Sequence, residues 1–134
     1  MGLLSERPLV LLVEDDRDGR IIFAEWLEEA GFRVDQAHNG LQALERAFDL
    51  LPDAVLTDLN IPGIDGYELT RRLKNDPRTR AIPILAVTGY VPFQDRARAD
   101  RAGCDAIFPK PCDPDELEQA LTALITEARG RRSA

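Results

Sequence analysis

The sequence predicts an α/β fold in which helices cover both faces of a single parallel sheet. Short apolar runs alternate with helix-length amphipathic stretches along the whole 134-residue chain. The first run, PLVLLV at residues 8–13, is almost continuously apolar, as expected for a central strand that is buried on both faces. Alternation of strands and helices implies right-handed crossover connections, and therefore a doubly wound sandwich with parallel strands.

The expected strands are short and mostly apolar, which is typical of strands in a buried parallel sheet. The second strand alternates, with Phe32, Val34 and Ala37 directed inward. The third is an apolar run that leads to Asp58 and is followed by a turn at residues 62–63, Pro-Gly. The five expected strands cover residues 8–13, 32–37, 54–56, 82–87 and 106–108.

Apolar residues at helical spacing predict five helices, and capping residues mark several of their ends. Asp65 is placed to cap the third helix, while Gly31 and Gly103 stop the first and the fourth. The helices are expected at 17–30, 41–51, 67–74 and 91–102, and the last begins near Asp113 or Pro114. The residues expected to face the core are Ile22, Trp26, Leu27 and Ala30 in the first helix, Leu41, Leu44, Ala47, Phe48 and Leu51 in the second, and Leu117, Leu121, Leu124 and Ile125 in the last.

Composition indicates one globular domain over residues 1–134, with a core of about 7–128 and a short, flexible, basic tail that holds Arg129, Arg131 and Arg132. With 44% hydrophobic residues and no apolar run near the ~20 residues of a membrane span, we expect a cytoplasmic protein without a membrane partner. The net charge of −7 argues against direct binding to nucleic acid. Cys104 and Cys112 lack the spacing of a zinc or redox pair, so we interpret them as reduced packing residues.

Reactive side chains follow four of the five expected strands. Glu14 and Asp15 come after the first, Asp58 after the third, Thr88 after the fourth and Lys110 after the fifth. Taken singly, these residues have ordinary explanations as helix caps, turn residues or solvated charges. Because the carboxyl ends of parallel strands share one edge of the sheet, where ligands bind in this class of fold, their joint placement predicts a functional site.

Clustered carboxylates repel one another, and a bound cation removes that repulsion. Oxygen ligands on Asp15 and Asp58 suit Mg²⁺, which often bridges protein carboxylates and phosphate groups. A carboxylate such as that of Asp58 can also attack phosphorus and form an aspartyl phosphate. The ammonium of Lys110 and the hydroxyl of Thr88 would then stabilise charge on the transferring group.

Four motifs in this order, VEDD, LTDLNIPGIDGYEL, AVTGY and PKP, resemble the receiver domain of two-component response regulators. The resemblance covers almost the entire chain. It implies a flavodoxin-like (βα)5 sandwich whose five parallel strands are arranged in the order 2-1-3-4-5. It also implies a cis peptide bond between Lys110 and Pro111.

The same resemblance implies a role for each matching residue, with Mg²⁺ as the cofactor and Mn²⁺ as a substitute. Asp16 has no role in that scheme, and we expect it to cap the first helix. The implied roles are Asp58 as phosphoacceptor, Asp15 as direct metal ligand, Glu14 as metal ligand through water, Asn60 as metal ligand through its backbone carbonyl, Thr88 as switching hydroxyl and Lys110 as partner of the phosphoryl group.

The resulting hypothesis is a single-domain response regulator that accepts a phosphoryl group from a histidine kinase or a histidine phosphotransfer protein. Such a protein is not a conventional enzyme, although it catalyses its own phosphorylation and dephosphorylation. It would signal by protein contact through the face formed by the fourth helix and fifth strand. A receiver cut from a larger hybrid kinase has the same sequence features, so that alternative stays open.

Two other classes of function, a binding module and a phosphohydrolase, are also compatible with parts of the sequence. A phosphorylation-independent binding module could keep the fold, but it would gain nothing from the charge crowding at the strand ends. A metal-dependent phosphohydrolase needs a second acid two residues after its nucleophile, and Asn60 cannot donate that proton.

One position departs from the family pattern. Ile107 stands where family members commonly carry Tyr or Phe, so either it simply fills the core or coupling runs through Phe108, Tyr90 or a helix shift. We also hypothesise that the bulk of Tyr90, two residues after Thr88, slows dephosphorylation.

Overall fold

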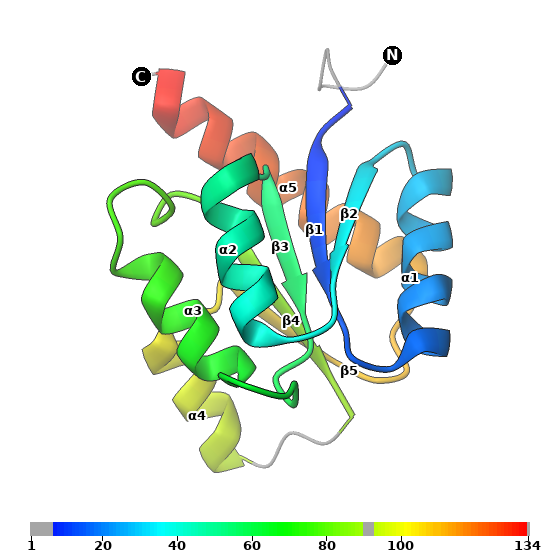
Figure 1. The fold of residues 1–134 in the computed structure, drawn as a ribbon. Helices are drawn as coiled ribbons and strands as arrows, with labels where there is room; N and C mark the ends of the chain where they lie inside the picture. The colour runs from blue at the N-terminus through cyan, green and yellow to red at the C-terminus, as the bar shows by residue number, and fades with distance from the viewer. Residues whose placement is uncertain (1–6, 90–92, 134) are drawn as a thin grey trace.

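The computed structural model describes residues 7–89 and 93–133, so the hypothesis about Tyr90 lies outside the described residues. Strands and helices alternate along the chain (Figure 1). The strands are β1 (Leu9–Val13), β2 (Arg33–Ala37), β3 (Ala54–Thr57), β4 (Ile84–Thr88) and β5 (Ala106–Pro109). The helices are α1 (Arg17–Glu29), α2 (Gly40–Leu50), α3 (Gly66–Lys74), α4 (Phe93–Ala102) and α5 (Pro114–Ser133).

The five strands form one parallel sheet in the order β2-β1-β3-β4-β5, which confirms the predicted flavodoxin-like fold. The central position of β1 is visible in the register, where Leu11 lies between Asp35 of β2 and Val55 of β3. All strands run in one direction, so their carboxyl ends meet at one edge of the sheet. That edge carries the residues singled out from the sequence.

Successive residues of β1 pack into opposite layers, because side chains alternate between the two faces of a strand. Val10 and Leu12 belong to a cluster with residues of α1 and α5, among them Phe23 and Leu121. Leu11 and Val13 belong to a second cluster with residues of α2 and α3. The two-sided burial explains why the first strand is continuously apolar rather than alternating.

Two helices present a different face to the core from the one expected. In α1, Ile22 is 46% exposed, and Phe23 is buried in its place. One residue along a helix is a rotation of about 100°, and packing of Phe23 with residues of β1 and α5 selects this face. Within the helix, the Phe23 ring packs edge-on against Trp26 with 5.4 Å between centroids. In α2, Leu41 and Leu51 are exposed.

The second helix buries small residues instead of large ones. Its buried positions are Gly40, Ala43 and Ala47. A Cβ added to Gly40 would lie 2.0 Å from the carbonyl oxygen of Ile64, so only glycine allows this helix to begin so close to the loop after β3. The predicted stripe was therefore right at Ala47, which is buried, and at Leu44, which packs against the core, and wrong at Leu41 and Leu51, which are exposed.

The last helix is longer than expected. We predicted a flexible tail after about Ala128, but α5 continues to Ser133. Ala128 is buried, and the Arg129 guanidinium lies 3.1 Å from Oδ1 of Asp53, which attaches the end of the helix to the start of β3. Neither α5 nor any other helix in the described part of the chain is long and apolar enough to span a membrane.

Both cysteines are free thiols, as predicted. Cys104 is buried with its Sγ 3.7 Å from Thr70 Oγ1, and burial raises the pKa of this thiol. Cys112 is half-buried, and burial raises its pKa as well. Neither thiol is activated as a nucleophile at neutral pH, which agrees with a packing role.

Helix α3 begins directly against the loop that follows β3. Asp65 caps it as predicted, since its Oδ1 accepts a hydrogen bond of 2.9 Å from the backbone N–H of Glu68. The next residue, Gly66, donates its N–H to the carbonyl oxygen of Leu59 at 2.9 Å. A Cβ on Gly66 would lie 2.6 Å from the carbonyl oxygen of Asp58 and 2.6 Å from the Cα of Leu59, both of them rigid backbone atoms.

We therefore expect Gly66→Ala to lower the free energy of unfolding by about 1–3 kcal/mol, the usual cost of overpacking a rigid site. Urea denaturation measures this change. Gly130→Ala is the matched control, because Gly130 lies within α5 with nothing within 4 Å of an added Cβ. In a helix that control substitution stabilises by up to about 1 kcal/mol. Equal effects of the two substitutions would contradict the close approach at Gly66.

Candidate functional site

The candidate site lies at the carboxyl edge of the sheet, where backbone hydrogen bonds continue just beyond the strands. The N–H of Asp58 donates to the carbonyl oxygen of Val13 at 3.0 Å, which ties the end of β3 to β1. The N–H of Lys110 donates to the carbonyl oxygen of Thr88 at 2.8 Å and ties β5 to β4 in the same way. These bonds fix the backbone from which the functional side chains extend.

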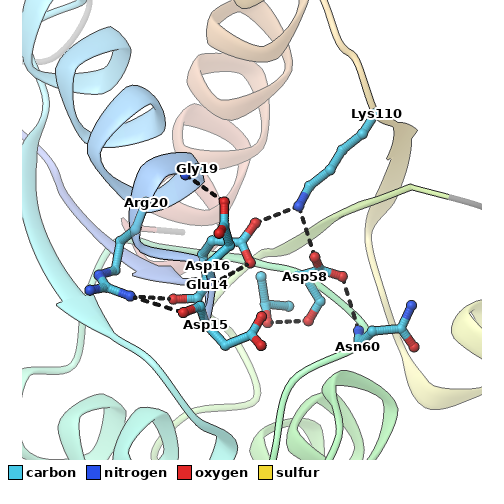
Figure 2. Close-up of polar contacts among 9 residues, drawn as sticks. Glu14, Asp15, Asp16, Gly19, Arg20, Asp58, Asn60 and Lys110 are labelled. Carbon is cyan, nitrogen blue, oxygen red and sulfur yellow. Dashed lines mark hydrogen bonds and ion pairs between the residues drawn. The ribbon is translucent and has the colours of Figure 1, made fainter.

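The ammonium of Lys110 bridges two carboxylates that come from different strands (Figure 2). Its Nζ lies 2.8 Å from Oδ2 of Asp58 and also donates to Oε1 of Glu14. The side chains of Glu14 and Asp58 are only 3% and 11% exposed, against 29% for Lys110. One cation thus neutralises two largely buried acids.

The two ends of this ion pair have shifted pKa values. Burial raises the pKa of Glu14, although the hydrogen bond from Lys110 acts in the opposite direction. Burial would lower the pKa of Lys110, but hydrogen bonds to Asp58 and Glu14 outweigh that effect and raise it. Lys110 is therefore a protonated ammonium at neutral pH, which is the form that can bind an anionic group.

The carboxylate of Asp58 is held at both oxygens. Oδ1 accepts a hydrogen bond of 2.9 Å from the N–H of Asn60, and Oδ2 accepts the bond from Lys110. The hydroxyl of Thr57 donates to the carbonyl oxygen of Asp58 at 2.8 Å and steadies the backbone. A carboxylate that is held in a fixed orientation can act as a nucleophile.

Thr88 ends β4 with its side chain turned into the protein. The residue is 1% exposed, and Oγ1 has no hydrogen-bond partner within the described part of the chain. A buried hydroxyl without a partner costs about 1–3 kcal/mol, so such a group is unusual unless it serves a function. Its position at the strand edge makes it available to an anionic group that binds there.

The loop after β1 contributes exposed acids and a contact that the sequence did not reveal. Asp15 is exposed, and Asp16 caps α1 as predicted, accepting a hydrogen bond of 2.8 Å from the N–H of Gly19. The guanidinium of Arg20 donates to the carbonyl oxygens of Glu14 at 2.9 Å and of Asp15 at 3.5 Å (Figure 2). In the sequence, this contact is indicated only by the spacing of Arg20, which lies one helical turn after the cap residue Asp16.

The donors at this edge fit a magnesium ion. Mg²⁺ typically takes one or two carboxylates and keeps several waters, and Asp15 and Asp58 offer hard oxygen ligands of that kind. Within residues 7–89 and 93–133, no group of three or more His, Cys, Asp and Glu side chains is arranged to hold a metal ion.

Comparison with known proteins identifies the family. Residues 10–122 match the response regulator receiver domain. The chain therefore belongs to the response regulator receiver domain family of two-component signalling. The peptide bond between Lys110 and Pro111 is cis, as the resemblance implied.

Relatives of known type support this assignment. The chain is 35% identical over 129 residues to the response regulator Rre1 of Synechocystis, covering 95% of this chain but only 56% of that protein. It is 32% identical to the polar-differentiation response regulator DivK of Brucella anthropi, covering 89% of this chain and 97% of that one.

Solved structures agree with both the sequence relatives and the fold. The receiver domain of a sensor histidine kinase from Pseudomonas aeruginosa, crystallised with a magnesium ion in its active site cleft, superimposes with a TM-score of 0.84 and 32% identity, covering 90% of this chain and 98% of that one. A response regulator structure from Chloroflexus aurantiacus superimposes with a TM-score of 0.86 and 31% identity, covering 90% of this chain and 99% of that one.

Ile107, the position that departs from the family pattern, is half-buried in β5. It packs against a small cluster made of Leu59, Ala86, Ala99 and Cys104. This packing agrees with the expectation that Ile107 fills the core. Phe108, the next residue, packs into the other layer, against the cluster that contains residues of α1 and α5.

We expect Lys110→Met to lower the free energy of unfolding by about 1–3 kcal/mol in metal-free buffer at pH 7, because it leaves the buried Glu14 carboxylate without a counter-charge. Adding Glu14→Gln to this variant removes the more deeply buried of the two carboxylates that lose their counter-charge and should recover part of the loss. Chemical denaturation of the two variants and the wild type measures both changes. A double variant no more stable than Lys110→Met would contradict the bridging role of Lys110.

Proposed function

We propose that this receiver domain accepts a phosphoryl group on Asp58 from a histidine kinase or a histidine phosphotransfer protein. The observation that carries the proposal is the Asp58 carboxylate, which Lys110 and the N–H of Asn60 orient at the same edge of the sheet where β4 ends in Thr88, whose buried hydroxyl has no partner among the described residues. A nucleophile, a cation and a free hydroxyl at one edge are the groups that phosphoryl transfer to a carboxylate needs.

The reaction needs few parts from the protein. A carboxylate oxygen of Asp58 attacks phosphorus, the bond from phosphorus to the imidazole nitrogen of the donor breaks, and the imidazole keeps that electron pair. The products are an acyl phosphate on Asp58 and a histidine that takes up a proton from water. Lys110 remains an ammonium throughout and interacts with a phosphoryl oxygen.

Magnesium, or manganese in its place, would neutralise charge on the phosphoryl oxygens when bound. The residues that would hold it are Asp15, Asp58 and the backbone carbonyl of Asn60, with Glu14 through a water molecule. The magnesium ion in the active site cleft of the related Pseudomonas receiver supports magnesium as the metal.

A phosphoryl group on Asp58 would change the balance of charges at the edge. Lys110 now divides its hydrogen bonds between Glu14 and Asp58, and a phosphorylated Asp58 offers it a stronger anionic partner. The hydroxyl of Thr88 gains the acceptor that it lacks. Movement at Thr88 would shift the face formed by α4 and β5 between two states with different affinities for a downstream protein.

The hypothesis is tested by incubation with acetyl phosphate and Mg²⁺, followed by intact mass measurement. We expect the mass of one phosphoryl group on the wild type, and none on Asp58→Asn or after removal of divalent ions with EDTA. Asp49→Asn, an exposed position on α2, is the control for loss of an acid and should be modified like the wild type. An unmodified wild type would favour a phosphorylation-independent binding module, and rapid catalytic turnover would favour a phosphohydrolase.

A second experiment tests the role of Thr88. Thr88→Val removes a buried hydroxyl that makes no hydrogen bond to any described residue, so we expect the free energy of unfolding to stay the same or rise by about 1 kcal/mol. Thr70→Val is the matched control, since Thr70 is equally buried but donates to the carbonyl oxygen of Gly66 at 2.7 Å, and its replacement should destabilise by about 1 kcal/mol.

The same variant separates phosphorylation from its readout. Thr88→Val should still accept a phosphoryl group from acetyl phosphate, but the NMR chemical shifts of α4 and β5 should change less than in the phosphorylated wild type. Shift changes as large as those of the wild type would contradict a switching role for Thr88.

A further inference from the structure

Charge is unevenly distributed along this acidic chain. Residues 66–102, which contain α3 and α4, carry eight Lys and Arg and four Asp and Glu, a net charge of +4. The remaining residues carry nine basic and twenty acidic side chains, a net charge of −11. The segment that holds α3, β4 and α4 is therefore net basic in a protein that is otherwise strongly acidic, and two of its cations, Arg98 and Lys74, pair with Asp65 and Asp105 just outside the segment.

A groove lies on this basic segment, between two helices that are neighbours in the fold (Figure 1). It has a volume of about 210 Å³ and is distinct from the candidate phosphorylation site. It is lined by Tyr67, Glu68, Arg71, Arg98, Arg101 and Ala102.

On the α3 side of the groove, arginine side chains bind the carboxylate of Glu68, a residue of the same helix. Arg71 donates two hydrogen bonds to it, at 3.0 Å and 2.5 Å, and Arg72 donates a third at 2.8 Å. These bonds lower the pKa of Glu68 to about 2. The groove thus has the fork geometry in which guanidinium groups recognise carboxylates.

On the α4 side of the groove, the guanidinium groups of Arg98 and Arg101 have N–H donors that are available to a ligand. The Cζ of Arg98 lies over the Tyr67 ring, 3.9 Å from its centroid, and a guanidinium placed over an aromatic ring can still donate hydrogen bonds from its N–H groups. Its ion pair with Asp65 is long, at 3.4 Å, and its side chain is 53% exposed. Arg101 is exposed and makes no ion pair with any side chain that the structure describes.

We propose that this groove docks a carboxylate-rich segment of a partner protein, with Arg98 and Arg101 as its main recognition residues. The stacked guanidinium of Arg98 is pre-oriented for a bidentate contact, and Arg101 adds a charge that no described side chain compensates. A long nucleic acid is a poorer occupant, because the net charge of −11 outside this segment repels an extended polyanion. The groove lies between α3 and α4, apart from the α4–β5 face proposed for the output.

The test uses a fluorescein-labelled oligoglutamate peptide and fluorescence anisotropy at low ionic strength, where contacts between exposed charges are strongest. We expect saturable binding to the wild type and about tenfold weaker binding to Arg98→Ala/Arg101→Ala, from about 0.7 kcal/mol for each exposed charge contact. Glu68→Gln should bind more tightly than the wild type, because it releases Arg71 and Arg72 from their internal carboxylate.

The control variant is Arg17→Ala/Arg131→Ala, which removes the same charge from exposed positions on α1 and α5. It should bind the peptide within about twofold of the wild type, and circular dichroism should show all variants folded. Three results would overturn the proposal: no saturable binding by the wild type, an equal loss in the control variant, or tighter binding of a single-stranded oligonucleotide of the same charge.

Discussion

The bridge from Lys110 to Glu14 and Asp58 is the interaction on which the arrangement of the site depends. Its members are 96 and 52 residues apart in the sequence, and only the strand order brings them together. Neighbouring strands lie about 4.8 Å apart, so β5 is about 10 Å from β3 and further from β1. A long, flexible lysine side chain that crosses β4 can reach both acids, whereas a shorter cationic side chain could not. The strand order and the length of this side chain therefore work together.

Glu14 and Thr88, at the carboxyl edge of the sheet, lower the stability of the fold and serve the proposed phosphoryl transfer. The Glu14 carboxylate is almost fully buried, and its raised pKa means that ionisation at neutral pH costs folding free energy. The hydroxyl of Thr88 is buried without a partner. Both sit at the end of a sheet whose inner strands are apolar and covered on each face by a separate cluster. The two-layered core offsets these costs, as is typical of functional sites placed on rigid scaffolds.

Sequence patterns predicted the strand order, the helix caps at Asp16 and Asp65 and the set of residues at the edge, because each depends on local spacing or on the family motifs. Sequence patterns failed where packing between elements distant in the sequence decides which helix face is buried, where a helix ends or which side chains meet. The face that α1 presents was missed because Ile22 and Phe23 both fit a helical period, and only contact with the sheet selects Phe23. The extension of α5 to Ser133 depends on the ion pair of Arg129 with Asp53, 76 residues away. The bridging position of Lys110 likewise depends on side-chain reach, which spacing does not encode.

The packing of β5 restricts the routes by which a signal could leave the site. Because side chains alternate along β5, Ile107 faces the layer of α4, and Phe108 faces the layer of α1 and α5. Phe108 therefore cannot take the place of the missing aromatic ring toward α4. Ile107 shares its cluster with Ala99 of α4 and with Tyr67 of α3, whose ring lies under Arg98. A shift of α4 against this apolar cluster therefore fits the packing of the described residues better than a route through Phe108 does, and Ile107 has no ring that could rotate between an inward and an outward position.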